Sequence, residues 1–142
     1  MADAARHSVS VAAVVVDDQD RALLIRRRDN GHWEPPGGVL ELDEDIAGGL
    51  RREVAEETGL HVEPSALTGV YKNMNRGIVA LVFRCRQDGG ALTTASETTE
   101  ARWATRDEVI GLSDPAYAIR VLDALDFTTP PAVRAHDGVQ LV

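Results

Sequence analysis

The stretch that decides the fold runs from Gly38 to Leu60 and reads GVLELDEDIAGGLRREVAEETGL. Its apolar residues recur every four positions, which predicts a helix with one stripe facing a core: Ile46, Leu50, Val54 and Thr58. We expect Asp43 or Glu44 to cap the start of this helix and to place negative charge at its positive end. Gly59 lies where a left-handed residue ends a helix.

A loop of unusual composition leads into this helix. Residues 33–38 read WEPPGG, and the two consecutive prolines exclude regular structure there. Gly37 and Gly38 allow the backbone to pass close to a ligand, so we treat both as candidate substrate-binding positions. The run Arg26 to Arg28 precedes the loop; such a run is often a solvated strand end, but Arg28 is also a candidate phosphate ligand.

Three glutamates, Glu53, Glu56 and Glu57, stand near the end of the predicted helix. At about 100° per residue they fall within an arc of roughly 100°, where like charges repel one another. One interpretation is a solvated acidic face. The other is a set of carboxylates that binds a hard divalent cation, for which Mg²⁺ or Mn²⁺ is favoured over zinc.

The same residues resemble the signature of the Nudix hydrolases. That signature is a glycine, five residues, a glutamate, seven residues, and then Arg-Glu-apolar-x-Glu-Glu-x-Gly-apolar. This sequence fills every position without a mismatch: Gly38, Glu44, Arg52, Glu53, Val54, Glu56, Glu57, Gly59 and Leu60. The resemblance implies an α/β fold, a Nudix-type α/β/α sandwich with a mixed β-sheet between helices. It also implies hydrolysis of a diphosphate linkage with the help of a divalent metal, Mg²⁺ or Mn²⁺ as its substitute.

The resemblance assigns roles to the residues of the helix. Glu53, Glu56 and Glu57 become the metal-binding and proton-accepting carboxylates, with Glu53 and Glu57 as the preferred ligands. Glu56 is either a ligand or the base that takes the proton of the attacking water. Arg52 joins the catalytic group as the residue that orients Glu56, four positions away. Glu44 is implied to be structural.

Other residues extend this site. Glu97 is a candidate extra metal ligand, because some Nudix hydrolases carry a further carboxylate outside the signature; Glu100 competes for that role, and an exposed loop glutamate is the alternative for both. Gly49 precedes Glu53 by one turn, where a larger side chain would obstruct a phosphate or would simply be tolerated.

Length and composition limit the alternatives. A chain of 142 residues suits one domain, and we expect residues 1–142 to form it, with residues 1–7 and 127–142 as loose or surface-draped tails. The net charge of −8 argues against binding polymeric nucleic acid. Cys85 is the single cysteine and no apolar run is long enough to span a membrane, so we expect a cytoplasmic protein. The composition leaves open whether it forms a homodimer.

The remaining elements follow from hydrophobic patterns. Residues 9–16 predict a buried strand, and residues 22–25 a second one. Residues 62–71, interrupted by Pro64, and residues 78–85 predict a hairpin. We expect a polar loop over residues 95–100, a short strand from Trp103, and a helix that opens with Ser113-Asp114-Pro115.

Three functions are compatible with the family resemblance. A metal-dependent pyrophosphohydrolase is favoured over a non-catalytic nucleotide sensor, because the signature is intact, and over an RNA-end processor, because the charge is acidic. The residues after Leu60 lack the family markers for ADP-ribose, dinucleoside polyphosphates and NADH. We therefore expect a nucleoside triphosphate, intact or damaged, to be cleaved to the monophosphate and pyrophosphate. ADP-ribose or a nucleotide sugar is the alternative substrate.

Overall fold

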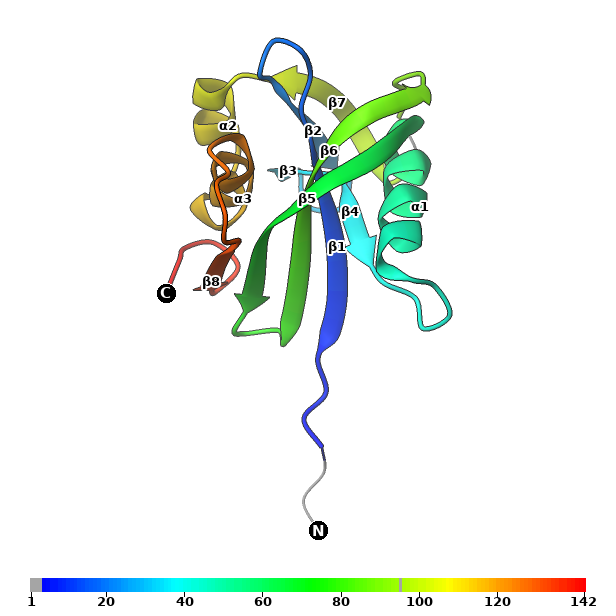
Figure 1. Ribbon diagram of the computed structural model, residues 1–142. Helices are drawn as coiled ribbons and strands as arrows, with labels where there is room; N and C mark the ends of the chain where they lie inside the picture. The colour runs from blue at the N-terminus through cyan, green and yellow to red at the C-terminus, as the bar shows by residue number, and fades with distance from the viewer. Residues whose placement is uncertain (1–3, 95) are drawn as a thin grey trace.

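The computed structural model describes residues 4–94 and 96–142. Its elements follow the chain in this order: β1 (Ser8–Val15), β2 (Ala22–Arg27), β3 (Trp33–Glu34), β4 (Gly37–Val39), α1 (Ile46–Thr58), β5 (Leu60–Asn73), β6 (Ile78–Gly90), β7 (Thr98–Ala104), α2 (Arg106–Leu112), α3 (Pro115–Leu125) and β8 (Ala132–His136). The strands lie between α1 on one side and α2 with α3 on the other (Figure 1). The α/β/α sandwich with a mixed sheet is therefore confirmed.

The strands form two sheets. The larger has the order β4-β1-β6-β5-β8, in which β1 is antiparallel to β4 and parallel to β6. The smaller has the order β3-β2-β7 and is antiparallel throughout. The short strands β3 and β4, on either side of the two prolines, each form an edge of one sheet, and β4 lies against α1.

Strand β1 supplies a core on each of its faces, because successive side chains of a strand point to opposite sides. Val11, Ala13 and Val15 pack with the apolar stripe of α1, including Leu50 and Val54. The alternate residues of β1 pack with α2 and α3: Ala12 and Val14 lie in one cluster with Val109, Ala118 and Val121. Burial on both faces explains the unbroken apolar run that predicted this strand.

Helix α1 begins one residue later than the sequence indicates. Asp45 is the N-cap, and its side chain accepts a hydrogen bond from the Gly48 N–H at 2.6 Å. The prediction that Asp43 or Glu44 caps the helix is thus wrong, because Glu44 bonds elsewhere. Gly59 ends the helix at φ 76°, which confirms the left-handed C-cap. Three residues of the stripe are buried, but Ile46 in the first turn is 41% exposed.

Two other predictions change in detail, and one helix is new. Pro64 does not end a strand, because β5 continues past it through register shifts and pairs with β6 as the expected hairpin. Part of the predicted polar loop belongs to β7, which starts at Thr98; Ala95 lies outside the described residues. Helix α2 was not predicted. Helix α3 starts with Pro115 after Asp114, as expected.

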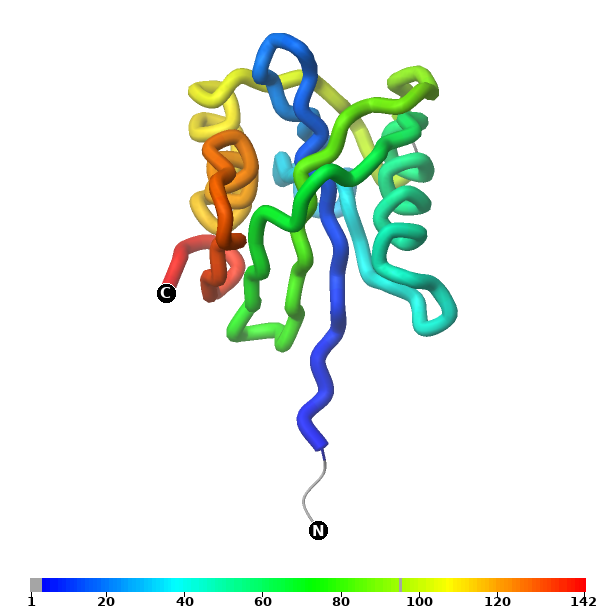
Figure 2. The backbone as a smooth tube through the Cα atoms, viewed as in Figure 1, coloured from blue at the N-terminus to red at the C-terminus, as the bar shows by residue number. Residues whose placement is uncertain are grey.

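The C-terminal segment is a structural part of the domain. Residues 127–142 were predicted to be a loose or surface-draped tail, and the pairing of β8 contradicts the first alternative. Strand β8 pairs in parallel with β5, from Gly69↔Ala132 to Asn73↔His136. His136 is fully buried. The last residues fold back beside this strand, as the backbone trace shows (Figure 2). Residues 4–7 are exposed and lie outside any helix or strand. In the described ranges, no helix has both the length and the apolar character needed to cross a membrane.

Candidate active site

A cavity of about 550 Å³ opens between α1, β4 and the segment that leads into β7. Its lining mixes charged and apolar residues from regions far apart in the sequence: Ile25, Arg27, Arg28, Asp29, Glu34, Gly37, Gly38, Val39, Glu53, Glu57, Ser96, Glu97 and Thr98. Six of the predicted site residues therefore line one cavity: Arg28, Gly37, Gly38, Glu53, Glu57 and Glu97. The fold therefore brings acidic residues that are distant in the sequence to one concave site.

Glu53 and Glu57 lie one helical turn apart and face the cavity together. The side chain of Glu53 is only 15% exposed. Burial, together with the hydrogen bond and the charge of Glu53, raises the pKa of Glu57 to about 9. The backbone N–H of Gly37 acts in the opposite direction, because it favours the charged form of the Glu57 carboxyl. Two carboxyl groups in contact share a proton because a second negative charge is costly there, and a cation would replace that proton.

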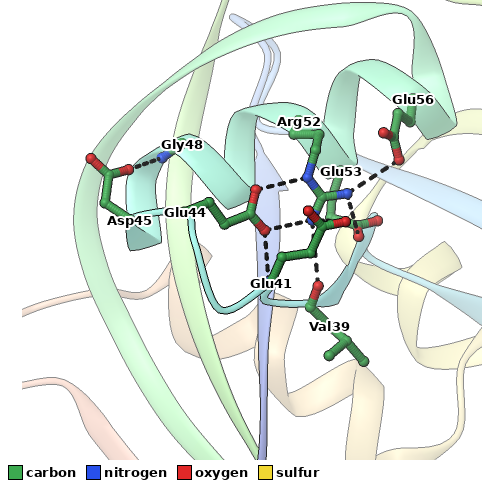
Figure 3. A network of polar contacts seen from close by, with 8 residues as sticks. All are labelled: Val39, Glu41, Glu44, Asp45, Gly48, Arg52, Glu53 and Glu56. Carbon is green, nitrogen blue, oxygen red and sulfur yellow. Dashed lines mark hydrogen bonds and ion pairs between the residues drawn. The ribbon is translucent and has the colours of Figure 1, made fainter.

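Arg52, the residue before Glu53 in the helix, holds the Glu53 carboxylate in place. Its Nε and Nη2 donate to the two carboxylate oxygens of Glu44 at 2.8 and 2.6 Å, and its Nη1 donates to Glu53 at 3.0 Å. Figure 3 shows the guanidinium at the centre of this network. The hydrogen bond from Arg52 lowers the pKa of Glu44 to about 2, and Glu44 also accepts from the Glu41 N–H. Glu44 thereby connects the loop before α1 to Arg52 in the middle of α1.

Glu56 does not line the cavity. Its side chain is 62% exposed, and its carboxylate accepts from Arg52 Nη1 at 3.3 Å. Arg52 thus contacts Glu56, as the sequence suggests, but its shortest hydrogen bonds go to Glu44.

The glycines of the site are required by close packing. A Cβ atom on Gly38 would lie 2.5 Å from the carboxyl carbon of Glu53, and one on Gly37 would collide with the backbone of β1 at Val11. A Cβ atom on Gly49 would collide with Leu40 and lie 2.8 Å from Glu44. Gly49 is therefore explained by close packing against Leu40 and Glu44. The expected role, leaving space for a phosphate, is not needed to explain it.

Arg28 and Glu97 lie side by side, just after β2 and just before β7. The backbone N–H of Arg28 donates to the Glu97 carbonyl at 2.9 Å, and its Nε donates to the Ser96 carbonyl at 2.6 Å. Both side chains line the cavity. Glu100, the competing candidate, forms an ion pair with Arg26 at 3.3 Å and is not part of the lining.

Sequence reasoning missed Glu34, which lines the same cavity. Burial raises its pKa in spite of the ion pair with Arg27, whose Nη1 lies 3.2 Å from the carboxylate. A signal was present in the sequence: Glu34 is the one charged residue of the segment WEPPGG. A charge inside a proline- and glycine-rich loop that packs against a core is a candidate for function.

The donor set suits a hard divalent cation. In residues 4–94 and 96–142, no three His, Cys, Asp or Glu side chains form a ready metal-binding cluster. The Glu53–Glu57 pair supplies two carboxylates, however, and Mg²⁺ is usually held by one or two carboxylates together with substrate phosphates and water. The residues present therefore fit such an ion in the presence of a phosphorylated substrate.

Comparisons with known proteins agree with this geometry. A sequence model described as "NUDIX domain" matches residues 6–123. A MutT-like protein from Streptomyces ambofaciens is 60% identical over 136 residues, which are 96% of this chain and 88% of that protein. The human 8-oxo-dGDP phosphatase NUDT18 is 34% identical over 139 residues, which cover 93% of this chain but only 36% of that longer protein.

A solved structure is also similar. The MutT protein from Methanosarcina mazei Go1 has a TM-score of 0.72 at 28% identity, and the match covers 84% of this chain and 93% of that one. The chain belongs to the Nudix family and is a pyrophosphohydrolase. Nudix hydrolases act on small nucleotide substrates and generally use a divalent metal ion.

Proposed function

We propose that this chain hydrolyses a nucleoside triphosphate, intact or damaged, to the monophosphate and pyrophosphate, with Mg²⁺ as its metal ion and Mn²⁺ as a substitute. The observation that carries the proposal is the convergence of Glu53, Glu57, Glu97 and Arg28 on one cavity. Acidic and basic groups thus line a single space that a triphosphate can enter. The proposed location is the cytoplasm, where such nucleotides are made and used.

The carboxylates of α1 are assigned to the metal ion. Glu53 and Glu57 would hold it, and Glu56 would join them if its carboxylate turned from Arg52 toward the cavity. Arg52 keeps Glu53 in place through the hydrogen bond at 3.0 Å. When bound, the ion would neutralise phosphate oxygens and lower the pKa of a coordinated water.

The remaining residues bind the substrate and move the proton. Arg28 donates hydrogen bonds to a phosphate oxygen, and the phosphate chain passes along the backbone of Gly37 and Gly38, which line the cavity in β4. Glu97 and Glu56 are the candidates for accepting the proton of the attacking water or for completing the metal site. Glu97 fits the role of base better, since it lines the cavity and Glu56 does not.

The choice of substrate draws on the relatives. The human relative is named for a damaged nucleotide, 8-oxo-dGDP, which favours a damaged nucleotide here as well. Purified protein with Mg²⁺ should be incubated with dGTP, 8-oxo-dGTP, 8-oxo-dGDP, ADP-ribose and a UDP-sugar, and the products separated by ion-exchange chromatography. We expect monophosphate and pyrophosphate from a triphosphate at the highest kcat/KM. Higher efficiency with ADP-ribose or the UDP-sugar would select the alternative, and no product from any of them would refute the proposal.

A further inference from the structure

A second cavity, of about 140 Å³, lies on the other side of β4. It is lined from β1, β4, α3 and the β5–β6 end of the sheet, and it shares Arg27, Glu34, Gly37 and Gly38 with the first cavity. Its other lining residues include apolar ones and three buried polar ones: Ala12, Ile78, Ala80, Tyr117, Asn73, Arg120 and His136. A substrate whose phosphates occupy the first cavity can therefore extend into the second past Glu34.

Arg120 is the unusual residue of this cavity. It is 8% exposed, and its Nε atom has no hydrogen-bond partner within residues 4–94 and 96–142. Its guanidinium lies over the rings of Tyr71 and Tyr117, at 5.2 and 4.8 Å from their centroids. Glu34 supports its charge only through space, and burial lowers the pKa of Arg120. A buried guanidinium with an unpaired N–H is costly unless an acceptor reaches it.

His136 adds a second donor at the same place. The Gly138 N–H donates to its Nδ1 atom at 2.9 Å, so Nδ1 acts as the acceptor. The proton of the neutral ring is then on Nε2, which lies 3.2 Å from Arg120 Nη2. Two donors thus face each other inside the protein. A ligand oxygen within reach of His136 Nε2 and of the Arg120 guanidinium would accept hydrogen bonds from both side chains.

We propose that the second cavity binds the nucleobase of the substrate and that Arg120 determines specificity by donating to a carbonyl oxygen of the base. This inference rests on the proposed function, because the phosphates of the same substrate would occupy the first cavity. A base fits better than a phosphate for two reasons. Tyr117, Ala12 and Ala80 suit a flat apolar ring, and the Glu34 carboxylate at the same cavity can accept a hydrogen bond from a base N–H, which a phosphate does not offer.

Two triphosphates that differ at one edge of the base test the proposal. Inosine triphosphate carries the C6 carbonyl, whereas purine riboside triphosphate lacks it. The wild-type enzyme should prefer inosine triphosphate by at least about tenfold in kcat/KM, because a site built around a hydrogen bond rejects the analogue that cannot make it. Arg120→Met should reduce this preference to less than about twofold. The control Arg106→Met removes an exposed arginine paired with Asp126 and should keep the preference.

The outcomes separate the two proposals. Equal efficiency of the wild-type enzyme with both triphosphates overturns the inference even if Arg120→Met does not fold. An equal loss in Arg120→Met for both triphosphates, with the wild-type preference unchanged, assigns Arg120 to a phosphate and also overturns it. If neither triphosphate is hydrolysed, the proposed function fails. The ratio of their dissociation constants, measured by calorimetry, then still tests recognition of the carbonyl.

Discussion

Glu53 lies between a glycine and an arginine that together fix its carboxylate. Gly38 leaves the space that the carboxylate fills, and Arg52 holds it by a hydrogen bond of 3.0 Å. The position of the Glu53 carboxylate thus depends on the absence of a side chain at Gly38. Displacing a catalytic group by about 1 Å can reduce the rate by about 100-fold.

Gly38→Ala should therefore impair activity more than stability. The new Cβ would lie 2.5 Å from the end of the Glu53 side chain, which can rotate away while the backbone stays in place. We expect kcat/KM to fall at least about tenfold, with a free energy of unfolding within about 1 kcal/mol of wild type. Steady-state kinetics and urea denaturation measure the two effects.

Gly111→Ala is the matched control. A Cβ atom at Gly111, in α2, would meet nothing within 4 Å. This variant should keep wild-type activity and gain up to about 1 kcal/mol, since alanine favours a helix over glycine. Full activity of Gly38→Ala would contradict the role assigned to this glycine.

For single residues, the sequence predicts which side chains share one face of a helix. It does not predict which side chains from distant segments meet in the folded protein. Glu53 and Glu57 are about 40° apart around the helix, while Glu56 lies about 60° to the other side of Glu53. The sequence places all three near one another, but only the packing of α1 against β1 and β4 selects the face that meets the cavity. Glu34 and Arg120 were missed because their position depends on the arrangement of the sheets and of α3.

Helix α1 carries the acidic site, and its start is fixed by side chains with separate tasks. Asp45 caps the helix, whereas Glu44 joins Arg52. Asp45→Ala should lower the free energy of unfolding by about 1 kcal/mol, as loss of an N-cap does. Asp43→Ala changes a neighbouring exposed aspartate and should stay within about 0.5 kcal/mol of wild type. Equal effects of the two changes in denaturant titrations would show that Asp45 is not the cap.

Elements with a strong local pattern could be predicted, and elements defined by distant partners could not. The valines of β1 and the proline at the start of α3 have local causes. Helix α2 is only 7 residues long, too short for a clear apolar period, although its capping box at Thr105 and Glu108 is visible in the sequence. Strand β8 owes its existence to pairing with β5, more than 60 residues earlier. Prolines nearby suggested a tail instead.

At the scale of the whole molecule, β8 completes the edge of the larger sheet and carries the buried residue His136. Burial, together with the charge of Arg120, lowers the pKa of His136 below its ordinary value of 6.5. As the pH falls, the unfolded chain therefore takes up this proton before the native protein does. The stability that depends on neutral His136 is complete above about pH 6.5 and declines below it, by at most about 1.4 kcal/mol per pH unit.

The pH dependence of unfolding tests this assignment. Between about pH 7 and 5.5, the free energy of unfolding of wild type should fall more steeply than that of His136→Gln. His61→Gln, at an exposed position, should keep the wild-type slope. The slope is the relevant quantity, because His136→Gln is also expected to lower stability at every pH. Identical slopes for wild type and His136→Gln would mean that His136 titrates normally.

The central claim is that Glu53 and Glu57 form the metal-binding wall of a diphosphate-cleaving site. The most direct measurement is Mg²⁺-dependent turnover of the preferred triphosphate by Glu53→Gln and Glu57→Gln, beside Glu63→Gln, which alters a glutamate paired with Arg51 away from the cavity. We expect kcat to fall by about 100-fold or more in the first two variants and to change less than about twofold in the third. Undiminished turnover after either of the first two changes would contradict the claim.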